Sequence, residues 1–125
     1  MELIRNYPEV KKCSKSYVLA INDTLNVLSG KWKMPIIGSL LYGNKRFKDI
    51  QNSIDKITPR MLSKELKDLE INGVIQRKVH NNRPVLIEYE LTESGKNITF
   101  VLDSMVKWGL NHRKIVLDID LKCTE

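Results

Sequence analysis

The segment ITPRMLSKELKDLEING, residues 57–73, predicts a helix with two unlike faces. Thr58 is a favourable N-cap residue, and Pro59 suits the first helical position, where a missing N–H costs nothing. Gly73 is typical of the residue that follows a helix end. We therefore expect a helix over residues 58–72. Leucines mark its inner face and short or cationic side chains its outer face: Leu62, Leu66 and Leu69 inside, Arg60, Ser63, Lys64 and Lys67 outside.

Three further helical patterns precede this one. Apolar residues recur at helical spacing from Val18 to Leu28 and predict a helix over about 17–29, which Gly30 ends. A short and nearly all-apolar helix with Pro35 in its first turn follows and ends at Gly43-Asn44. The next helix begins near residue 46. Its inner face carries Phe47, Ile50 and Ile54, and Arg46 lies on its outer face.

After Gly73 the apolar period changes from 3.6 to 2, which predicts strands over 74–80 and 85–91 joined by a polar turn, residues 81–84. A last long helix is expected over about 93–116. It is apolar on more than one side, and such a helix needs two partners. One partner is its own domain, and we expect the other to be a second copy of the chain.

Three short helices followed by a hairpin predict a winged helix-turn-helix, mainly α with a two-stranded β-wing. We divide the chain into an N-terminal arm (1–16), a winged helix-turn-helix domain (17–92) and a C-terminal dimerisation helix with its tail (93–125). The positive charge lies in the middle part. Residues 31–83 hold 12 basic and 5 acidic residues, a net of +7, whereas the remainder holds 9 basic and 10 acidic residues, a net of −1.

A basic segment of this kind suits a polyanion such as nucleic acid. The major groove is ~12 Å wide and admits one α-helix. We therefore expect the helix 58–72 to enter the major groove, with the wing, 80–84, on the backbone or in the minor groove. The candidate DNA-binding residues are Thr58, Pro59, Arg60, Ser63, Lys64, Lys67, Asn82, Arg83 and Arg46.

The chain resembles the HxlR-type winged-helix transcriptional regulators, which are related to the MarR-like group. The resemblance covers about residues 19–112 and implies a homodimeric DNA-binding repressor or activator that dimerises through the arm, the first helix and the last helix. It rests on ordered segments at matching spacing: residues 30–32, 46–50, 57–62, 66–70, 73–75, 88–95, and 101–103 with 108–109.

Many relatives carry a cysteine just before the first helix, and some use it to sense electrophiles or oxidants. The corresponding place here is near Leu19, and Cys13 lies six residues earlier. Lys11, Lys12 and Lys15 surround Cys13, and nearby positive charge favours the reactive thiolate. Cys13 is therefore the redox candidate, and an incidental cysteine is the alternative.

Other function classes are less favoured. No P-loop, GxGxxG, HExxH or GxSxG motif occurs, so we expect neither an enzyme nor a bound cofactor. Two distant cysteines, Cys13 and Cys123, and two distant histidines offer no metal ligand set. No signal peptide or membrane span is visible, so we expect a cytoplasmic protein. A winged helix used only for protein–protein contact remains the alternative to DNA binding.

Overall fold

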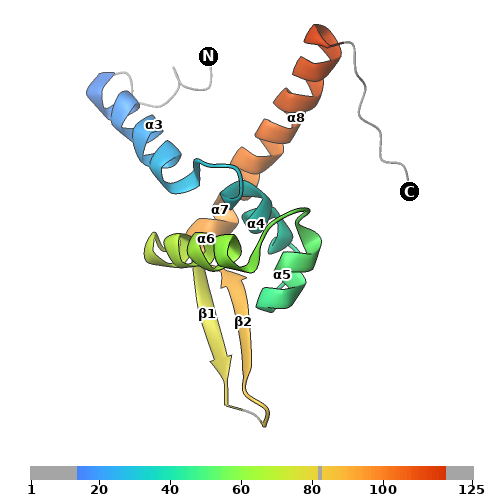
Figure 1. The fold of residues 1–125 in the computed structure, drawn as a ribbon. Coiled ribbons are helices and arrows are strands. Elements are labelled where there is room, and N and C mark those ends of the chain that lie inside the picture. Colours follow the sequence, from blue (N-terminus) through green and yellow to red (C-terminus); the bar gives the residue numbers. More distant parts are fainter. Residues whose placement is uncertain (1–13, 82, 118–125) are drawn as a thin grey trace.

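The computed structural model describes residues 14–81 and 83–117 (Figure 1). The expected fold class is confirmed, since a mainly helical chain carries one two-stranded antiparallel hairpin directly after the helix that bears the cationic face. The elements, in chain order, are α3 (Ser14–Leu28), α4 (Lys33–Ser39), α5 (Phe47–Ser53), α6 (Pro59–Ile71), β1 (Ile75–His80), β2 (Leu86–Leu91), α7 (Glu93–Asn97) and α8 (Thr99–Val116).

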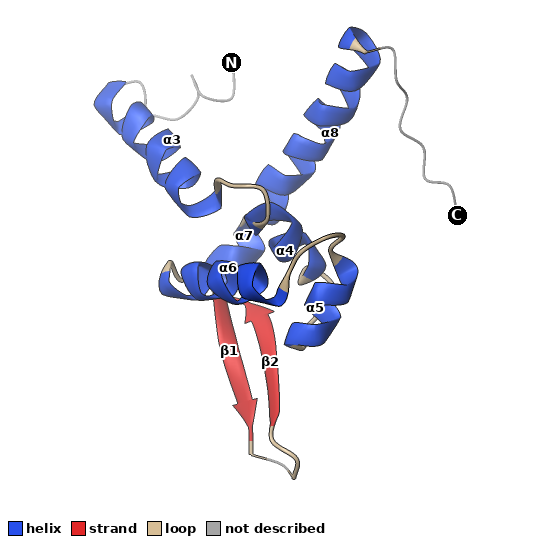
Figure 2. Cartoon of the chain, in the orientation of Figure 1, coloured by secondary structure: helices blue, strands red, loops and turns tan. Residues whose placement is uncertain are grey.

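The hairpin and the two longest helices leave the central body on opposite sides. Figure 2 shows α4, α5, α6 and α7 gathered in the middle, the hairpin extending from one side, and α3 and α8 diverging on the other. No helix in the described part of the chain is long and apolar enough to cross a membrane.

The core is built from the faces that periodicity predicts. Leu62, Leu66 and Leu69 of α6 are buried and pack with Ile50 of α5. The short apolar helix α4 is buried as expected. Its residues join those of the hairpin base to complete the core: Met34, Ile36, Ile37, Leu40, Ile57, Val74, Ile75 and Leu91.

Two helix boundaries differ from the predicted ones. Helix α3 begins at Ser14, inside the segment assigned to the arm, and α4 ends at Ser39 rather than at Gly43. After Ser39 the chain continues through tight turns in which N–H groups donate three residues back, as from Leu40 to the Ile37 carbonyl at 3.0 Å. Gly43 ends this turn with a φ of +144°, a conformation that favours glycine.

A single residue outside the hairpin pairs with β2, and the sequence pattern does not predict this pairing. Lys45, between α4 and α5, exchanges two backbone hydrogen bonds with Tyr89 of β2, at 3.0 and 2.7 Å. Strands β1 and β2 pair in regular register from Ile75 opposite Leu91 to His80 opposite Leu86. The bridge therefore attaches the base of the hairpin to the loop that precedes α5.

The predicted last helix is divided in two at Ile98. The Ile98 N–H donates to the Gly95 carbonyl, three residues back, at 3.2 Å, and this tighter turn separates α7 from α8. Thr92 caps α7 by accepting from the Gly95 N–H at 3.2 Å, while its own hydroxyl donates to the Gly73 carbonyl at 2.6 Å. The cap therefore ties α7 to the chain that leaves α6.

Candidate nucleic-acid interface

The first turn of α6 is organised by its predicted cap. The Met61 N–H donates to Thr58 Oγ1 at 3.2 Å, and Pro59 occupies the first helical position. Both Thr58 and Pro59 are exposed. The Thr58 hydroxyl accepts in the cap and keeps its own proton, so the same side chain is able to donate to a phosphate.

The outer face of α6 is cationic and open to solvent. Arg60, Ser63, Lys64 and Lys67 are all exposed, and the three cations form no ion pair with any described residue. The leucines on the opposite face are at most 1% exposed. The sequence predicts this arrangement of buried leucines on one face and exposed cations on the other. It leaves the charges available for an anionic ligand.

Two of the three acids of α6, Glu65 and Asp68, are paired on another flank of the helix, with a partner that the sequence pattern does not predict. Lys33, at the start of α4, places Nζ 2.6 Å from Glu65 Oε2 and 3.7 Å from Asp68 Oδ2. The side chains of Lys33 and Glu65 are only 12% and 15% exposed. The triad therefore fixes α6 against α4 and neutralises Glu65 and Asp68 away from the cationic face, whereas Glu70 remains exposed near Lys67.

On one face of the hairpin, the charged side chains of the two strands contact each other. Gln76 donates to Glu90, Lys78 Nζ lies 3.5 Å from Glu90 Oε2, and His80 Nε2 lies 2.9 Å from Glu88 Oε1. The Gln76 hydrogen bond, supported by Lys78, holds the pKa of the Glu90 carboxyl below its ordinary value. Both hairpin acids therefore have partners, and His80 contacts Glu88 rather than standing free.

The remaining predicted contacts lie at the edges of this surface. Arg83 is exposed at the tip of the hairpin, next to Pro84, and Arg46 is exposed at the start of α5, directly after the bridging residue Lys45. Asn82 and Cys13 lie outside the described residues. The structure thus places Arg60, Ser63, Lys64 and Lys67 together on α6 and Arg83 well apart from them, on the wing.

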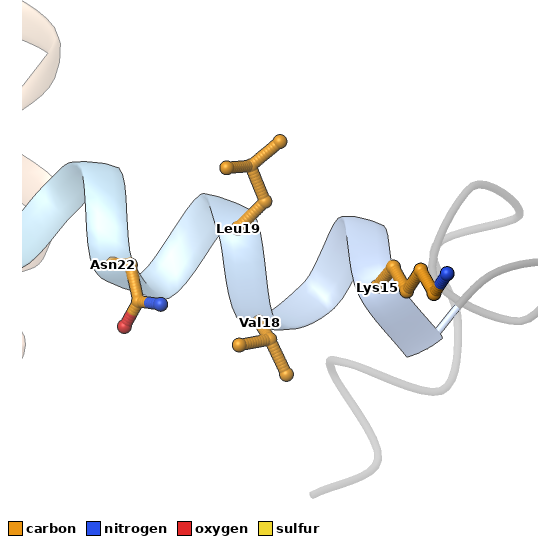
Figure 3. A pocket seen from close by; sticks show the side chains of 4 residues that line it. All are labelled: Lys15, Val18, Leu19 and Asn22. Carbon is orange, nitrogen blue, oxygen red and sulfur yellow. The ribbon is translucent and has the colours of Figure 1, made fainter.

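A second surface is apolar and belongs to α3 and α8. Val18 and Leu19 are exposed along α3, beside Lys15 and Asn22, around a shallow hollow (Figure 3). Helix α8 has no buried residue. Trp108 is 67% exposed and stacks on His112, with ring centroids 4.5 Å apart. Ile98 and Leu102, near the start of α8, are the apolar residues of this region that pack against the core among the described residues.

The two tryptophans therefore have different surroundings. Trp32 is partly buried against the core, and the Lys31 ammonium lies 4.8 Å from its ring centroid. Trp108 is not part of the core of its own chain. Among the described residues no group of His, Cys, Asp and Glu is arranged to hold a metal ion.

Comparison with known proteins identifies the arrangement. Residues 27–115 match the family model described as HxlR-like helix-turn-helix. The HTH-type transcriptional regulator YtcD of Bacillus subtilis (strain 168) is 41% identical over 98 residues, which are 78% of this chain and 78% of that protein. The family and this relative are transcriptional regulators, which confirms that the chain is of the regulator class and not of the enzyme class.

Solved structures show the same fold. The redox regulator HypR in its reduced form has a TM-score of 0.74 at 33% identity, with 80% of this chain and 99% of that chain covered. The quinone-bound YodB from B. subtilis has a TM-score of 0.62 at 32% identity, with 78% of this chain and 97% of that chain covered.

Proposed function

Because this chain belongs to the HxlR-like helix-turn-helix family of transcriptional regulators, we propose that it binds operator DNA as a homodimer. The observation that carries the proposal is the outer face of α6. Its three cations are exposed and without described ion-pair partners, while buried leucines hold the helix rigid from the other side. Helix α6 enters the major groove, and Arg83 on the wing contacts the backbone or the minor groove.

Within this interface, Arg60, Ser63 and Lys64 are our candidates for base edges, because the N-terminal part of a recognition helix lies deepest in the groove. Lys67, near the middle of α6, contacts the backbone together with Thr58, Pro59 and Arg46. Phosphate contacts fix the register of the protein on the duplex, and contacts to base edges specify the sequence.

The first prediction concerns these base contacts. Arg60→Ala and Lys64→Ala each weaken specific binding by about 1–3 kcal/mol, because each removes a charged donor to a base edge. The duplex is chosen by selecting bound sequences from a random pool with the unaltered protein, and fluorescence anisotropy gives the affinities. Lys107→Ala, which removes a cation from α8, is the control. Parent-like affinity in both α6 variants contradicts the assignment of α6 as the recognition helix.

Salt dependence separates DNA binding from the protein-interaction alternative. Neutralising several phosphates releases counterions, so the logarithm of the affinity falls linearly with the logarithm of the salt concentration. A steep slope supports operator binding. An absent or salt-insensitive interaction with every duplex in the pool contradicts it.

The exposed apolar residues of α3 and α8 support the homodimer. They lie on the side of the body away from the hairpin, so pairing through them leaves both α6 helices free for DNA (Figure 1). In such a dimer the two α6 helices enter successive major grooves, about 34–36 Å apart.

The second prediction tests this pairing. Leu110 of α8 is 43% exposed in one chain, and burial of this exposed part by a partner contributes about 1 kcal/mol per chain, or about 2 kcal/mol for the two copies in a dimer. Leu110→Gln therefore raises the dimer dissociation constant by roughly thirtyfold in sedimentation experiments. Asn111→Gln, its exposed neighbour on α8, leaves the constant unchanged. A parent protein that sediments as a monomer at micromolar concentration rejects the dimer.

The third prediction concerns Cys13. Its lysine neighbours favour the thiolate, and two related structures are described as a redox regulator and as a quinone-bound protein. We propose that peroxide or quinone reacts with Cys13 and releases the DNA. After treatment with peroxide or quinone, the parent protein and Cys123→Ser lose most of their DNA binding in anisotropy measurements. Cys13→Ser, treated in the same way, keeps its DNA binding. A Cys13→Ser variant that responds like the parent rules this sensor out.

A further inference from the structure

A polar cleft of about 310 Å³ separates α6 from the hairpin. One face of α6 and a cross-strand pair of the hairpin line it: Ser63, Leu66, Lys67, Glu70, Arg77 and Tyr89. We propose that this cleft seats one phosphate of the DNA backbone and that Arg77, a residue outside the predicted interface, is its principal ligand. The inference rests on the proposed DNA binding and adds a site to it.

The two faces of the hairpin carry different charges. Ile75, Arg77 and Val79 alternate with Gln76, Lys78 and His80 along β1, so the two sets lie on opposite faces. Ile75 is buried in the core beside α6, and Arg77 follows on the same face. The other face holds both hairpin acids, Glu88 and Glu90, with their partners. Of the two cations in β1, Lys78 pairs with Glu90, whereas Arg77, which faces α6, has no ion-pair partner among the described residues.

The geometry of a duplex requires a backbone strand at this place. The major and minor grooves are separated by one sugar–phosphate strand. In the proposed complex α6 lies in the major groove, and the wing reaches that strand or the minor groove beyond it. That strand has to pass between the helix and the hairpin. The cleft is the opening between these two elements, and its donors come from both.

The chemistry of the lining fits a phosphodiester. The Lys67 ammonium and the Arg77 guanidinium supply charged donors, and the guanidinium fork matches two phosphate oxygens. The hydroxyls of Ser63 and Tyr89 supply neutral donors. Glu70 is the one acid in the lining, so the cleft keeps a net charge of +1 and the acid limits how tightly an anion is held.

Arg77→Gln tests the site on two duplexes, one selected from the random pool and one of unrelated sequence. We expect roughly tenfold weaker binding to both duplexes and a salt slope smaller by about 0.9, the value for one lost phosphate contact. Lys67→Gln gives the same pattern from the other wall of the cleft. Glu70→Gln acts in the opposite direction and tightens binding several-fold, since it removes the repelling carboxylate.

Lys78→Gln is the matched control, because Lys78 is the next residue of β1, carries the same charge and faces Glu90 on the other side of the hairpin. It leaves the slope close to that of the parent. A methylphosphonate scan of the selected duplex then identifies the phosphate: one neutral position weakens the parent protein and weakens Arg77→Gln, which keeps the Lys67 contact, by a smaller factor.

The outcomes separate the two proposals. A parent protein without salt-dependent DNA binding overturns the proposed function itself. Normal binding by the parent, with equal slopes for Arg77→Gln and Lys78→Gln or weaker binding by Glu70→Gln, overturns the cleft alone. Binding of free inorganic phosphate by the parent and not by Arg77→Gln, while both bind the two duplexes alike, assigns the cleft to a small anion and also overturns the backbone contact.

Discussion

Gly95→Ala will lower the free energy of unfolding by about 3 kcal/mol or more, the upper range for inserting a methyl group into a packed core. Gly95 is buried in α7, and a Cβ built there lies 2.2 Å from the backbone carbonyl oxygen of Val74. A backbone atom cannot swing aside as the end of a long side chain does. The methyl group therefore separates α7 from the segment that links α6 to β1, and it strains the cap at Thr92.

Gly38→Ala is the matched control for this prediction. Gly38 also lies in a helix, α4, but its added Cβ meets only the Leu102 side chain, at an ordinary 3.6 Å. Alanine favours a helix over glycine by about 1 kcal/mol, so we expect unchanged or higher stability. Urea unfolding at one fixed protein concentration compares the two variants. Equal stability of Gly95→Ala and Gly38→Ala contradicts the close approach of α7 to Val74.

Lys33→Met will lower the free energy of unfolding by roughly 2–3 kcal/mol, because it leaves the Glu65 carboxylate largely buried without its cation. Methionine keeps the apolar stem of lysine, so the loss reports the charge. The double variant Lys33→Met/Glu65→Met recovers most of the stability, because an apolar pair of similar size replaces the buried ion pair. Failure of this rescue contradicts the unpaired Glu65 carboxylate as the cause of the loss.

The exposed pair Lys107–Asp103 on α8 provides the comparison. Its atoms lie 3.0 Å apart, but its side chains are 76% and 61% exposed. Water screens such a pair, and i,i+4 pairs contribute about 0.3–0.5 kcal/mol. Lys107→Met therefore changes stability by less than about 0.5 kcal/mol in the same urea measurement. A loss as large as that of Lys33→Met shows that burial does not set the strength of these pairs.

Much of the fold was predictable because it depends on local chemistry. The cap at Thr58 with Pro59 starts α6 where expected, Gly73 follows its end with φ +75°, and the leucine spacing marks the buried face. The change of period after Gly73 likewise located the hairpin. In each case the determining residues lie within one or two turns of the feature, and the pattern alone identifies it.

Features that depend on contacts distant in sequence were not predictable in this way. Lys33 and Glu65 are 32 positions apart, and nothing in the local pattern of either residue indicates the other. The bridge from Lys45 to Tyr89 involves one residue on each side, too short for an alternating pattern. The same reason applies to Arg77, because its proposed role depends on its position opposite Lys67 across the cleft.

For the candidate site, the sequence located the exposed cations of α6, and the structure groups them as expected. The proposed dimer face was predictable only as an apolar excess on the last helix. That excess is visible in the structure as exposed side chains such as Phe100, 78% exposed. Which residues meet across two chains depends on the second copy, and no periodicity within one chain encodes that arrangement.

The bridge at Tyr89 has a mechanical consequence for the wing. It clamps the hairpin near its root, whereas Val79, Val85 and Ile87, farther out, are exposed. The wing is therefore held at its base and less constrained toward its tip. Amide hydrogen exchange should accordingly become faster with distance from the Lys45–Tyr89 bridge. In the proposed complex, a wing of this kind lets Arg83 adjust to grooves of unequal width while α6 keeps its position.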